Sequence, residues 1–445
     1  MSCEGTPAMI DKVPHVVIVG GGFGGLAAAK ALKKAAVRLT LIDRTNHHLF
    51  QPLLYQVATS MLSPGHIASP IRSILRGQEN ATVLLGDVTG VDERQRCVCV
   101  DMPDRTAVPV PYDYLVIATG VRHSYFGHDE FARFAPAMKT LADAVDVRNK
   151  ILAAFELAET EEQPAEHRDL LTFVLVGGGP TGVEMAGAIA TMVGCTLKSE
   201  FRRIDPQSTR VILIEGSPRI LAGFSEGLSK KAHQRLTRLG VEVRPGTRVD
   251  HIDQDGVIAA GERIWSKTVI WTAGVTPSPA GKWLKAETDR SGRVRVQNDL
   301  TIPGHPEIFV IGDVASLEEN GRPLPGVAQV ALQQGQYAGK VIERRLTGRN
   351  APAPFRYLDK GSLAVVGKNF AVLESGNVRM SGWLAWLAWV VVHLQFLAQS
   401  SLRLTVLVQW LWTYVTGQRG ARLIVNHYGC PRTKPADEAK ETVAA

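Results

Sequence analysis

The chain has 445 residues, of which 45% are hydrophobic and 21% charged, values that exclude disorder, collagen and a coiled coil. At roughly 150 residues per domain, this length predicts two or three domains. The net charge of +7 allows an anionic partner such as nucleic acid or a membrane, and the five scattered cysteines favour a reducing compartment over a disulfide framework.

The first segments of the chain predict a nucleotide site. Residues 1–14 contain acids and no long apolar run, so we expect no export signal and a location on the cytoplasmic side. A β-branched strand from His15 runs into Gly20-Gly21-Gly22-Phe23-Gly24-Gly25 and an alanine-rich helix. This G-x-G-x-x-G turn between strand and helix is typical of dinucleotide binding, with the phosphates at the helix N-terminus. A second strand ends at Asp43, whose carboxylate can accept hydrogen bonds from a ribose. The alternative is a glycine-rich turn that binds nothing.

The same arrangement recurs in the middle of the chain. A strand at 172–176 precedes Gly177-Gly178-Gly179-Pro180-Thr181-Gly182 and a helix, and a later strand ends at Glu215. The crossover between them is longer, because it carries an insertion at roughly 194–208. Two such units predict two nucleotides, and therefore electron transfer from a nicotinamide to a flavin.

Further strands suggest how the two units are joined. Residues 114–120 (YLVIATG) and 269–275 (VIWTAGV) are near copies, and we expect the chain to pass between the nucleotide domains at these two points. Residues 308–313 (IFVIGD) end at Asp313, which is placed either to bind a ribityl chain or to cap a helix at 314–317.

Together these residues resemble the two-dinucleotide-binding-domain flavoproteins, and more closely the type II NADH dehydrogenases (NADH:quinone oxidoreductases). The resemblance covers almost the whole chain. It rests on both glycine turns, on residues 46–58 (NHHLFQPLLYQVA), on Glu184, on residues 328–335 (AQVALQQG), on Lys360-Gly361 and on a tryptophan-rich tail.

The resemblance implies an α/β fold of two Rossmann-like domains, with the NADH domain inserted in the FAD domain, and a C-terminal amphipathic helical membrane anchor. The expected boundaries are 14–122 and 274–345 for the FAD-binding domain, 123–273 for the NADH-binding domain, and 346–445 for the linker and anchor. It further implies a homodimer attached to one face of the membrane.

The resemblance also assigns residues to each ligand. FAD would contact Gly20, Gly22, Phe23, Gly24, Gly25, Asp43, Arg44, Val88, Gly120, Asp313, Gln329 and Lys360. NADH would contact Gly177, Gly179, Gly182 and Glu215. The expected catalytic residues are Glu184, in the cleft between nicotinamide and flavin, and Gln329 and Gln333, which would line a quinone site beside the flavin.

Residue chemistry supports these roles but leaves alternatives open. Glu215 favours NADH because a carboxylate repels the 2′-phosphate of NADPH, although the nearby Arg219 could soften that preference. Glutamine can donate to a quinone and accept from a quinol, but Gln329 and Gln333 could also be the polar face of a helix starting near Gly326. Glu184 could relay protons, or it could pair with a surface lysine.

Other chemistries find less support. Disulfide reductases and sulfide:quinone oxidoreductases need a cysteine pair beside the flavin, and this chain offers only Cys97 and Cys99, far from either turn. No metal site is expected, because His47 and His48 are adjacent and no carboxylate–histidine cluster has ligand spacing. No array of intramembrane carboxylates appears, so we expect no proton pumping. A ferredoxin-type reductase and a redox-sensing or scaffold flavoprotein remain as alternatives.

The tail is a different kind of polypeptide. Residues 375–436 contain no acid, five of the eight tryptophans, and six positive charges: Arg379, Arg403, Arg419, Arg422, Arg432 and Lys434. The 23 uncharged residues at 380–402 are long enough to span a bilayer but become polar in their second half, and 404–418 is too short to span. We expect two interfacial helices on an anionic membrane surface rather than a nucleic-acid partner, with a spanning helix or a buried dimer surface as alternatives.

Overall fold

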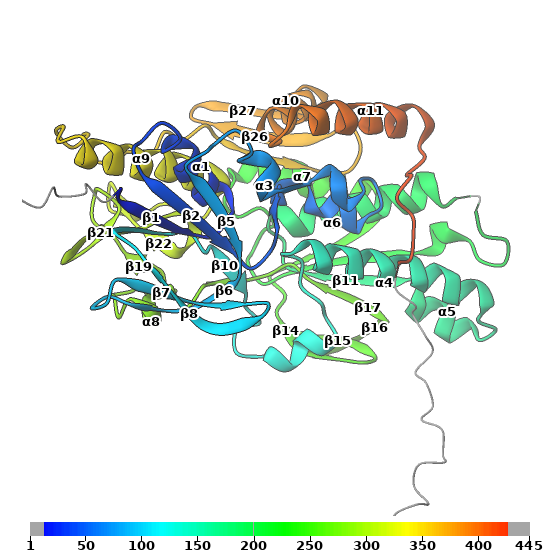
Figure 1. The fold of residues 1–445 in the computed structure, drawn as a ribbon. Helices are drawn as coiled ribbons and strands as arrows, with labels where there is room; N and C mark the ends of the chain where they lie inside the picture. The colour runs from blue at the N-terminus through cyan, green and yellow to red at the C-terminus, as the bar shows by residue number, and fades with distance from the viewer. Residues whose placement is uncertain (1–12, 199, 426–445) are drawn as a thin grey trace, which may run out of the picture.

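A computed structural model describes residues 13–198 and 200–425, and two parallel sheets form its framework (Figure 1). The first sheet has the strand order β20-β21-β9-β1-β2-β5, and only β20 is antiparallel to its neighbour. Its strands are β1 (His15–Val19), β2 (Arg38–Asp43), β5 (Ala81–Leu85), β9 (Tyr114–Ile117), β20 (Thr301–Ile302) and β21 (His305–Val310).

The second sheet repeats the core of the first. Its order is β13-β12-β11-β17, all parallel, so in both sheets the third, second, first and fourth strands of a unit lie side by side. The strands are β11 (Thr172–Val176), β12 (Arg210–Glu215), β13 (Val241–Pro245) and β17 (Thr268–Trp271). Helix α1 (Phe23–Ala31) follows β1 and α6 (Pro180–Thr191) follows β11, which confirms the repeated unit predicted from the two glycine turns.

Burial explains why these segments become central strands. Every residue of β1 and of β11 is buried, as expected for β-branched strands covered on both faces. Helix α9 (Ala328–Leu346) packs on α1, and the two backbones approach so closely that a Cβ at Gly335 would overlap the carbonyl oxygen of Gly24.

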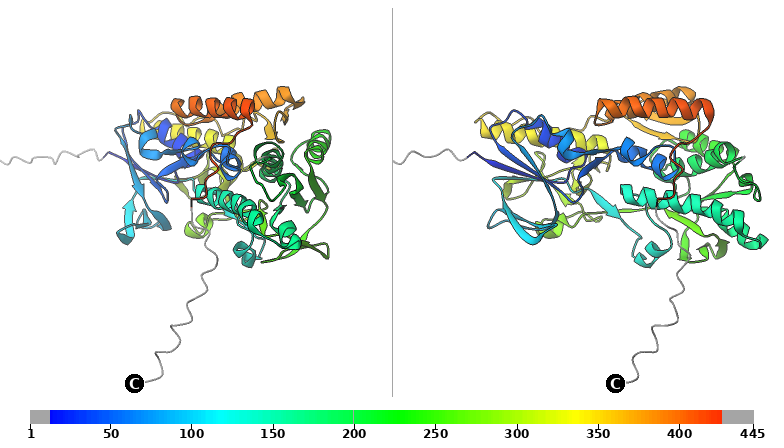
Figure 2. Two further views of the ribbon diagram at one scale, coloured as in Figure 1. Left: turned by 90° about the vertical axis from the view of Figure 1, so that its right-hand side faces the viewer. Right: turned by 45° about the vertical axis from the view of Figure 1, so that its right-hand side comes forward.

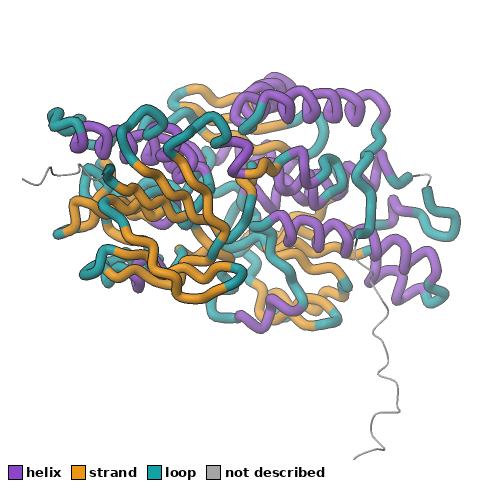
Figure 3. Tube along the Cα trace, viewed as in Figure 1, coloured by secondary structure: helices purple, strands orange, loops and turns teal. Residues whose placement is uncertain are grey.

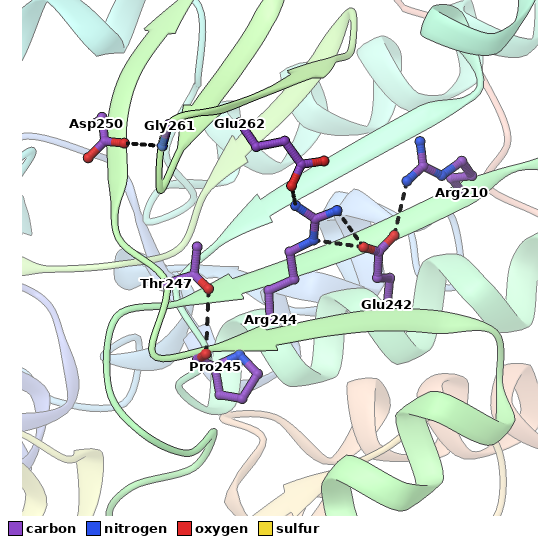
Figure 4. A network of polar contacts seen from close by, with 8 residues as sticks. All are labelled: Arg210, Glu242, Arg244, Pro245, Thr247, Asp250, Gly261 and Glu262. Carbon is purple, nitrogen blue, oxygen red and sulfur yellow. Dashed lines mark hydrogen bonds and ion pairs between the residues drawn. The ribbon is translucent and has the colours of Figure 1, made fainter.

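A three-stranded antiparallel meander stands between the third and fourth strands of each sheet. The first consists of β6 (Asp87–Asp92), β7 (Cys97–Met102) and β8 (Arg105–Pro111), and the second of β14 (Val249–Asp253), β15 (Gly256–Ala259) and β16 (Glu262–Trp265). Arg244 of β13 donates to Glu262 of β16 at 2.8 Å and pairs with Glu242, which also pairs with Arg210 (Figure 4). The partly exposed Arg244–Glu262 pair joins the meander to the sheet edge at little energetic gain.

Two short strands lie where the chain passes from one sheet to the other. β10 (Val121–His123) pairs antiparallel with β18 (Val275–Pro277), where the two near-copy segments of the sequence end. The Trp271 indole donates to the carbonyl of Ser124 at 3.0 Å and fixes this junction. The crossings therefore occur where the sequence predicted them, while the residue boundaries of the domains stay a prediction.

The C-terminal part adds a small sheet and two helices. β25 (Ser362–Val365), β26 (Ala371–Ser375) and β27 (Val378–Gly382) carry α10 (Trp383–Phe396) and α11 (Ser400–Thr416), which lie along one side of the molecule (Figures 2 and 3). Residues 380–402 are thus not one helix, since Leu397 is extended between α10 and α11. Among the described residues, no helix is long and apolar enough to cross a bilayer.

The chain then turns back along the body of the protein. Gly417, with a φ of +74°, ends α11 in the left-handed conformation, and residues 418–425 run from there towards α4 (Leu141–Thr160) (Figure 2). Arg432, Lys434, Cys430, Cys3 and the N-terminal acids Glu4 and Asp11 lie outside the described residues. The remaining α-helices of the described residues are α2 (Leu54–Ala58), α5 (Pro164–Leu170) and α7 (Glu226–Arg238), and the shorter α3 (Ile71–Ile74) and α8 (Ala280–Trp283).

Candidate active site

The first glycine turn has the geometry that its sequence predicts. Gly20 has a φ of +106°, and a Cβ at Gly25 would overlap the carbonyl oxygen of Gly20, so both positions require glycine. Gly22 is the N-cap of α1 and offers no side chain to the free N–H groups, and a Cβ there would meet no atom within 4 Å. The N-terminus of α1 therefore faces open space with unpaired donors.

The second turn has the same geometry as the first at the corresponding glycines. Gly177 has a φ of +112°, and a Cβ at Gly182 would overlap the carbonyl oxygen of Gly177. Gly179 is the N-cap of α6 without a side-chain bond, and its Cβ position is also open. The structure thus holds two similar anion-binding helix ends.

The acid at the end of each second strand closes onto its glycine turn. Asp43 Oδ2 accepts a hydrogen bond from the N–H of Gly21 at 2.6 Å, and Glu215 Oε2 accepts one from the N–H of Gly178 at 2.5 Å. Both carboxylates remain partly exposed beside the turns. Arg44, the next residue after Asp43, is exposed.

Asp313 lies in a short 3₁₀ turn after β21. No helix forms at 314–317, because Ala315–Ser316 is the strand β22, so the helix-capping alternative finds no support. Burial raises the pKa of the Asp313 carboxyl, and the charges of Lys139 and Arg293 oppose that rise. Within the described residues, its carboxylate makes no hydrogen bond, so its acceptors are free for a ligand.

The glutamines at the start of α9 have different environments. Gln333 donates from Nε2 to the carbonyl of Leu358 at 2.9 Å and accepts from the N–H of the same residue at 3.0 Å. Gln329 donates to the carbonyl of Gly361 at 3.2 Å, but its buried Oε1 has no partner among the described residues. The helix does begin close to Gly326, as the alternative required, yet Gln329 keeps a free acceptor. Lys360, on the same segment as Leu358 and Gly361, is exposed.

Glu184 is buried in the second turn of α6. Its side chain is 9% exposed, and burial raises the pKa of its carboxyl to about 8. Oε1 accepts a hydrogen bond from the N–H of Val365 at 3.3 Å, and no lysine of the described part forms an ion pair with it. The surface-lysine alternative therefore finds no support.

Glu184 lines a cavity between α2, α6, β25 and the two C-terminal helices. Its walls are largely apolar, and tryptophans from α10 and α11 form much of them. Its polar residues include Tyr55, Gln56, Glu184, Lys368 and Arg419. Gln329 and Gln333 do not line the cavity; residues 361–365 connect the Gln329 contact to the Glu184 contact.

Several residues at this site cannot be identified from the sequence. Tyr55 and Gln56 lie within residues 46–58, which carry the family resemblance, and Arg419 is one of several positive charges in the tail. Gln56 finds its partner Trp410 at a separation of 354 residues, which no local pattern reveals. The sequence does not single out Lys139, whose charge acts on Asp313, because this residue lies in a loop without a recognisable motif.

The other predicted residues occupy the first unit. Val88 is buried in β6, and Gly120, with a φ of +65°, accepts at its carbonyl from the N–H of Ser278 at 3.2 Å. The ring of Phe23 lies edge-on to those of His48 and Phe50, with centroids 5.0 and 5.8 Å apart. Within the described residues, no group of three or more metal-ligating side chains could hold a metal ion.

Comparison with known proteins identifies the family. Residues 14–335 match the family model of pyridine nucleotide-disulphide oxidoreductases. The chain is also 46% identical over 432 residues to the type II NADH:quinone oxidoreductase Ndh of Mycobacterium tuberculosis, covering 94% of this chain and 92% of that protein. The chain belongs to the type II NADH:quinone oxidoreductase family. NdhA of the same organism is 45% identical over 436 residues, covering 95% of this chain and 92% of its own.

The fold of this family member agrees with a solved structure. NDH2 of Plasmodium falciparum, solved in complex with NADH, has a TM-score of 0.84 and covers 93% of this chain and 100% of its own. Because the two sequences are only 20% identical, this likeness concerns the fold alone.

FAD is the cofactor of the type II NADH:quinone oxidoreductases, and the described residues fit it. The open position at Gly22 leaves room for phosphate at uncapped N–H groups. The free carboxylate of Asp313 suits the hydroxyls of a ribityl chain, and the unpaired Oε1 of Gln329 suits an N–H donor such as a flavin ring offers.

Proposed function

We propose that the chain transfers electrons from NADH through FAD to a membrane quinone and pumps no protons. The observation that carries this proposal is the pair of open, uncapped glycine turns, one at Gly22 and one at Gly179. Two dinucleotides bound in one chain suit a hydride transfer from one to the other, and the 46% identical relative is named for NADH and quinone.

Bound FAD would supply the two-electron redox chemistry that links NADH to the quinone. The chain's own groups bind and orient the partners. The N-terminus of α1 binds the FAD pyrophosphate, with Asp43 at the adenosine ribose, Val88 near the adenine and Asp313 at the ribityl chain. Gln329 and Gln333 lie at the flavin side of the quinone site, where Gln333 holds the segment that carries Lys360.

The α6 end binds NADH and brings an acid close to it. Gly177, Gly179 and Gly182 form the phosphate turn and Glu215 accepts from the ribose. NADH supplies one hydride, whereas a quinol needs two hydrogens, so each turnover takes up one further proton. The Glu184 carboxyl, whose raised pKa of about 8 keeps it protonated at neutral pH, is the proposed source of that proton.

We propose that α10 and α11 attach the protein to a membrane surface. Their exposed residues include Leu404, Leu411, Trp412 and Val415, which are 65%, 61%, 59% and 74% exposed, and Arg379 and Arg403 stand beside them. Apolar surface with flanking arginines suits an interfacial helix pair on anionic lipid. A homodimer and the cytoplasmic face of the membrane complete the proposal on the strength of resemblance.

The redox proposal is tested with the purified, detergent-solubilised protein. NADH added without oxygen should bleach the flavin absorbance, NADPH should do so far more slowly, and a short-chain quinone should restore it. A protein without a flavin spectrum, or a flavin that NADH leaves oxidised, contradicts the proposal.

The membrane proposal is tested by flotation with vesicles that contain phosphatidylglycerol. Leu411→Glu should lower the bound fraction severalfold, because it places a charge in the exposed face of α11. Leu157→Glu on α4 is the matched control, since Leu157 is 55% exposed on a helix away from that face. An unchanged bound fraction together with an altered oligomeric state would favour a dimer surface instead.

A further inference from the structure

The cavity beside Glu184 has a polar end whose hydrogen bonds have a fixed direction. The Trp410 indole can only donate, and its Nε1 lies 2.7 Å from Gln56 Oε1. The amide of Gln56 must therefore present its oxygen to Trp410 and its nitrogen to the other side. There, Nε2 donates to the hydroxyl oxygen of Tyr55 at 3.0 Å.

This arrangement leaves the hydroxyl proton of Tyr55 free. Because the Tyr55 oxygen already accepts from Gln56, its own O–H must point elsewhere. Within the described residues, it donates no hydrogen bond, although the side chain is only 4% exposed and lines the cavity. A buried donor without an acceptor costs free energy unless a ligand supplies one.

The surroundings indicate what kind of ligand would accept. Trp386, Trp389, Val390 and Trp410 give the cavity flat apolar walls, which suit a planar ring. At the polar end, the Glu184 carboxyl accepts a hydrogen bond on one oxygen from Val365 and from no other group in the described part of the chain. Arg419, 1% exposed, donates to the carbonyls of Thr59 and Ala188 and has no carboxylate partner among the described residues.

We propose that Tyr55 donates a hydrogen bond to a carbonyl oxygen of the quinone, and that Trp410 of α11, acting through Gln56, fixes the direction of this donor. The inference rests on the proposed function and adds to the quinone site a hydrogen-bond donor, Tyr55, and a residue that positions it, Trp410. A quinone brings an apolar ring and a carbonyl acceptor, which match the walls and the unused donor.

The balance of the reaction assigns separate tasks to the neighbouring groups. NADH, quinone and one proton give NAD⁺ and quinol. Tyr55 keeps its proton and positions the carbonyl, while Glu184 releases one: its O–H bond breaks, a quinol O–H bond forms, and the carboxylate recovers a proton from water. The positive charge of Arg419 stabilises the negative charge that develops on the quinone oxygen and on Glu184.

The same contacts make the site depend on the C-terminal helices. Trp410 belongs to α11, and without its indole the Gln56 amide is free to rotate and to accept the Tyr55 proton. Trp410 is therefore a positioning residue, and Tyr55 is the residue that meets the substrate. Correct docking of α11 would thus be required for quinone binding, whereas the NADH site on α6 would not require it.

The test is a double-mutant cycle in the full-length, FAD-loaded protein. Tyr55→Phe should raise the KM for a short-chain quinone about fivefold, as expected for one lost neutral hydrogen bond, and leave the rate of flavin bleaching by NADH unchanged. Trp410→Phe should raise the same KM by a smaller factor. The double variant should match Tyr55→Phe alone, because without the hydroxyl the orientation of Gln56 no longer matters.

Matched controls separate this role from general damage. Tyr337→Phe on α9 loses a hydroxyl bonded to the carbonyl of Ala353, and Trp265→Phe changes an exposed tryptophan of β16; neither residue lines the cavity. Both should leave the quinone KM unchanged. Flavin content and the melting temperature report whether each variant folds.

Two results would overturn the proposal: an unchanged quinone KM in Tyr55→Phe, or effects of the two single variants that simply add. A failure of the proposed function looks different, because the wild-type flavin would then not be reduced by NADH at all.

Discussion

The carboxylate of Glu215 accepts a hydrogen bond from the backbone N–H of Gly178 at 2.5 Å, and its second oxygen accepts from the N–H of Ser217 at 2.6 Å. Asp43 holds Gly21 and Thr45 in the same way in the first unit. Each acid therefore fixes the shape of its phosphate turn and places a negative charge at the end of the second strand. The two tasks explain why an acid ends this strand in both units.

Glu215→Gln should relax the preference for NADH. The substitution removes the charge that repels a 2′-phosphate, so kcat/KM for NADPH should rise and that for NADH should fall, changing their ratio about tenfold. Among the described residues Arg219 forms no ion pair with Glu215, since its guanidinium donates to the carbonyls of Leu221, Ala222 and Phe224. Steady-state kinetics with both nucleotides measure the ratio. Asp43→Asn is the matched control, and an equal change of the ratio there would contradict the assignment.

Glycine substitutions should separate binding from folding. Gly22→Ala places its methyl in open space at an allowed backbone conformation, so the apoprotein should keep its melting temperature and lose FAD affinity at least tenfold. Gly179→Ala should keep FAD and raise the KM for NADH for the same reason. Gly25→Ala would instead overlap the Gly20 carbonyl and lower stability by several kcal/mol. Flavin content, KM and thermal unfolding distinguish the three results, and an unaltered FAD affinity in Gly22→Ala would remove the first turn from the proposed site.

The sequence predicts the parts of this protein that depend on local spacing. Both glycine turns, their strands and the crossing points follow from short runs of residues such as HVVIVG and VIWTAGV, and the structure confirms them. Long-range contacts are another matter. Nothing near Tyr55 indicates that Trp410 will fix its neighbour, and nothing in the tail indicates that Arg419 will be buried against Ala188.

The tail shows a second limit. Counting uncharged residues at 380–402 allowed a spanning helix, but the extended Leu397 separates α10 from α11. Composition records that a segment is apolar, whereas the position of a break depends on how the helices pack on β25–β27 and α2. The roles of individual glutamines were equally hidden, since Gln333 and Gln329 differ only in the backbone groups that reach them.

Burial of Glu184 should make the stability of the protein depend on pH. Its folded pKa of about 8 lies above the ordinary value of 4.5, so between these pH values the folded state binds more protons than the unfolded state. The contribution of Glu184 to the free energy of unfolding is therefore fully present below pH 4.5. It is lost as pH rises towards 8, and the loss is a few kcal/mol at most. Glu184→Gln should abolish this loss and melt above the wild type at pH 8, with no difference at pH 4.5. Thermal unfolding across this range, at constant salt and FAD, checks the sign, and a variant that melts lower at pH 8 would contradict the burial of a neutral carboxyl.

The same substitution should affect turnover. If Glu184 supplies the proton for quinol formation, the wild-type kcat should fall as pH rises through about 8, where the carboxyl ionises beside Tyr55 and Arg419. Glu184→Gln should be slower at neutral pH and lack that fall. A profile of the same shape in both proteins would assign the proton to another group.

His48 should act on FAD through the backbone of the first turn. Its Nδ1 lies 3.0 Å from the carbonyl oxygen of Gly21, and burial, as the main cause, lowers the pKa of its imidazole to about 4, so the ring is neutral and donates. His48→Leu removes this donor and should weaken FAD binding about fivefold to tenfold, whereas His48→Asn keeps an N–H donor and should lose less.

The imidazole also contributes stability that is present above pH 6.5 and is lost as pH falls towards 4, because only the unfolded chain takes up the proton in that range. Titration of the apoprotein with FAD, followed by flavin fluorescence, and acid unfolding measure the two effects. His47→Asn is the neighbouring control, since the His47 ring contacts Asn46 and not the turn, and equal losses at positions 47 and 48 would mean that the segment rather than the Gly21 contact determines affinity.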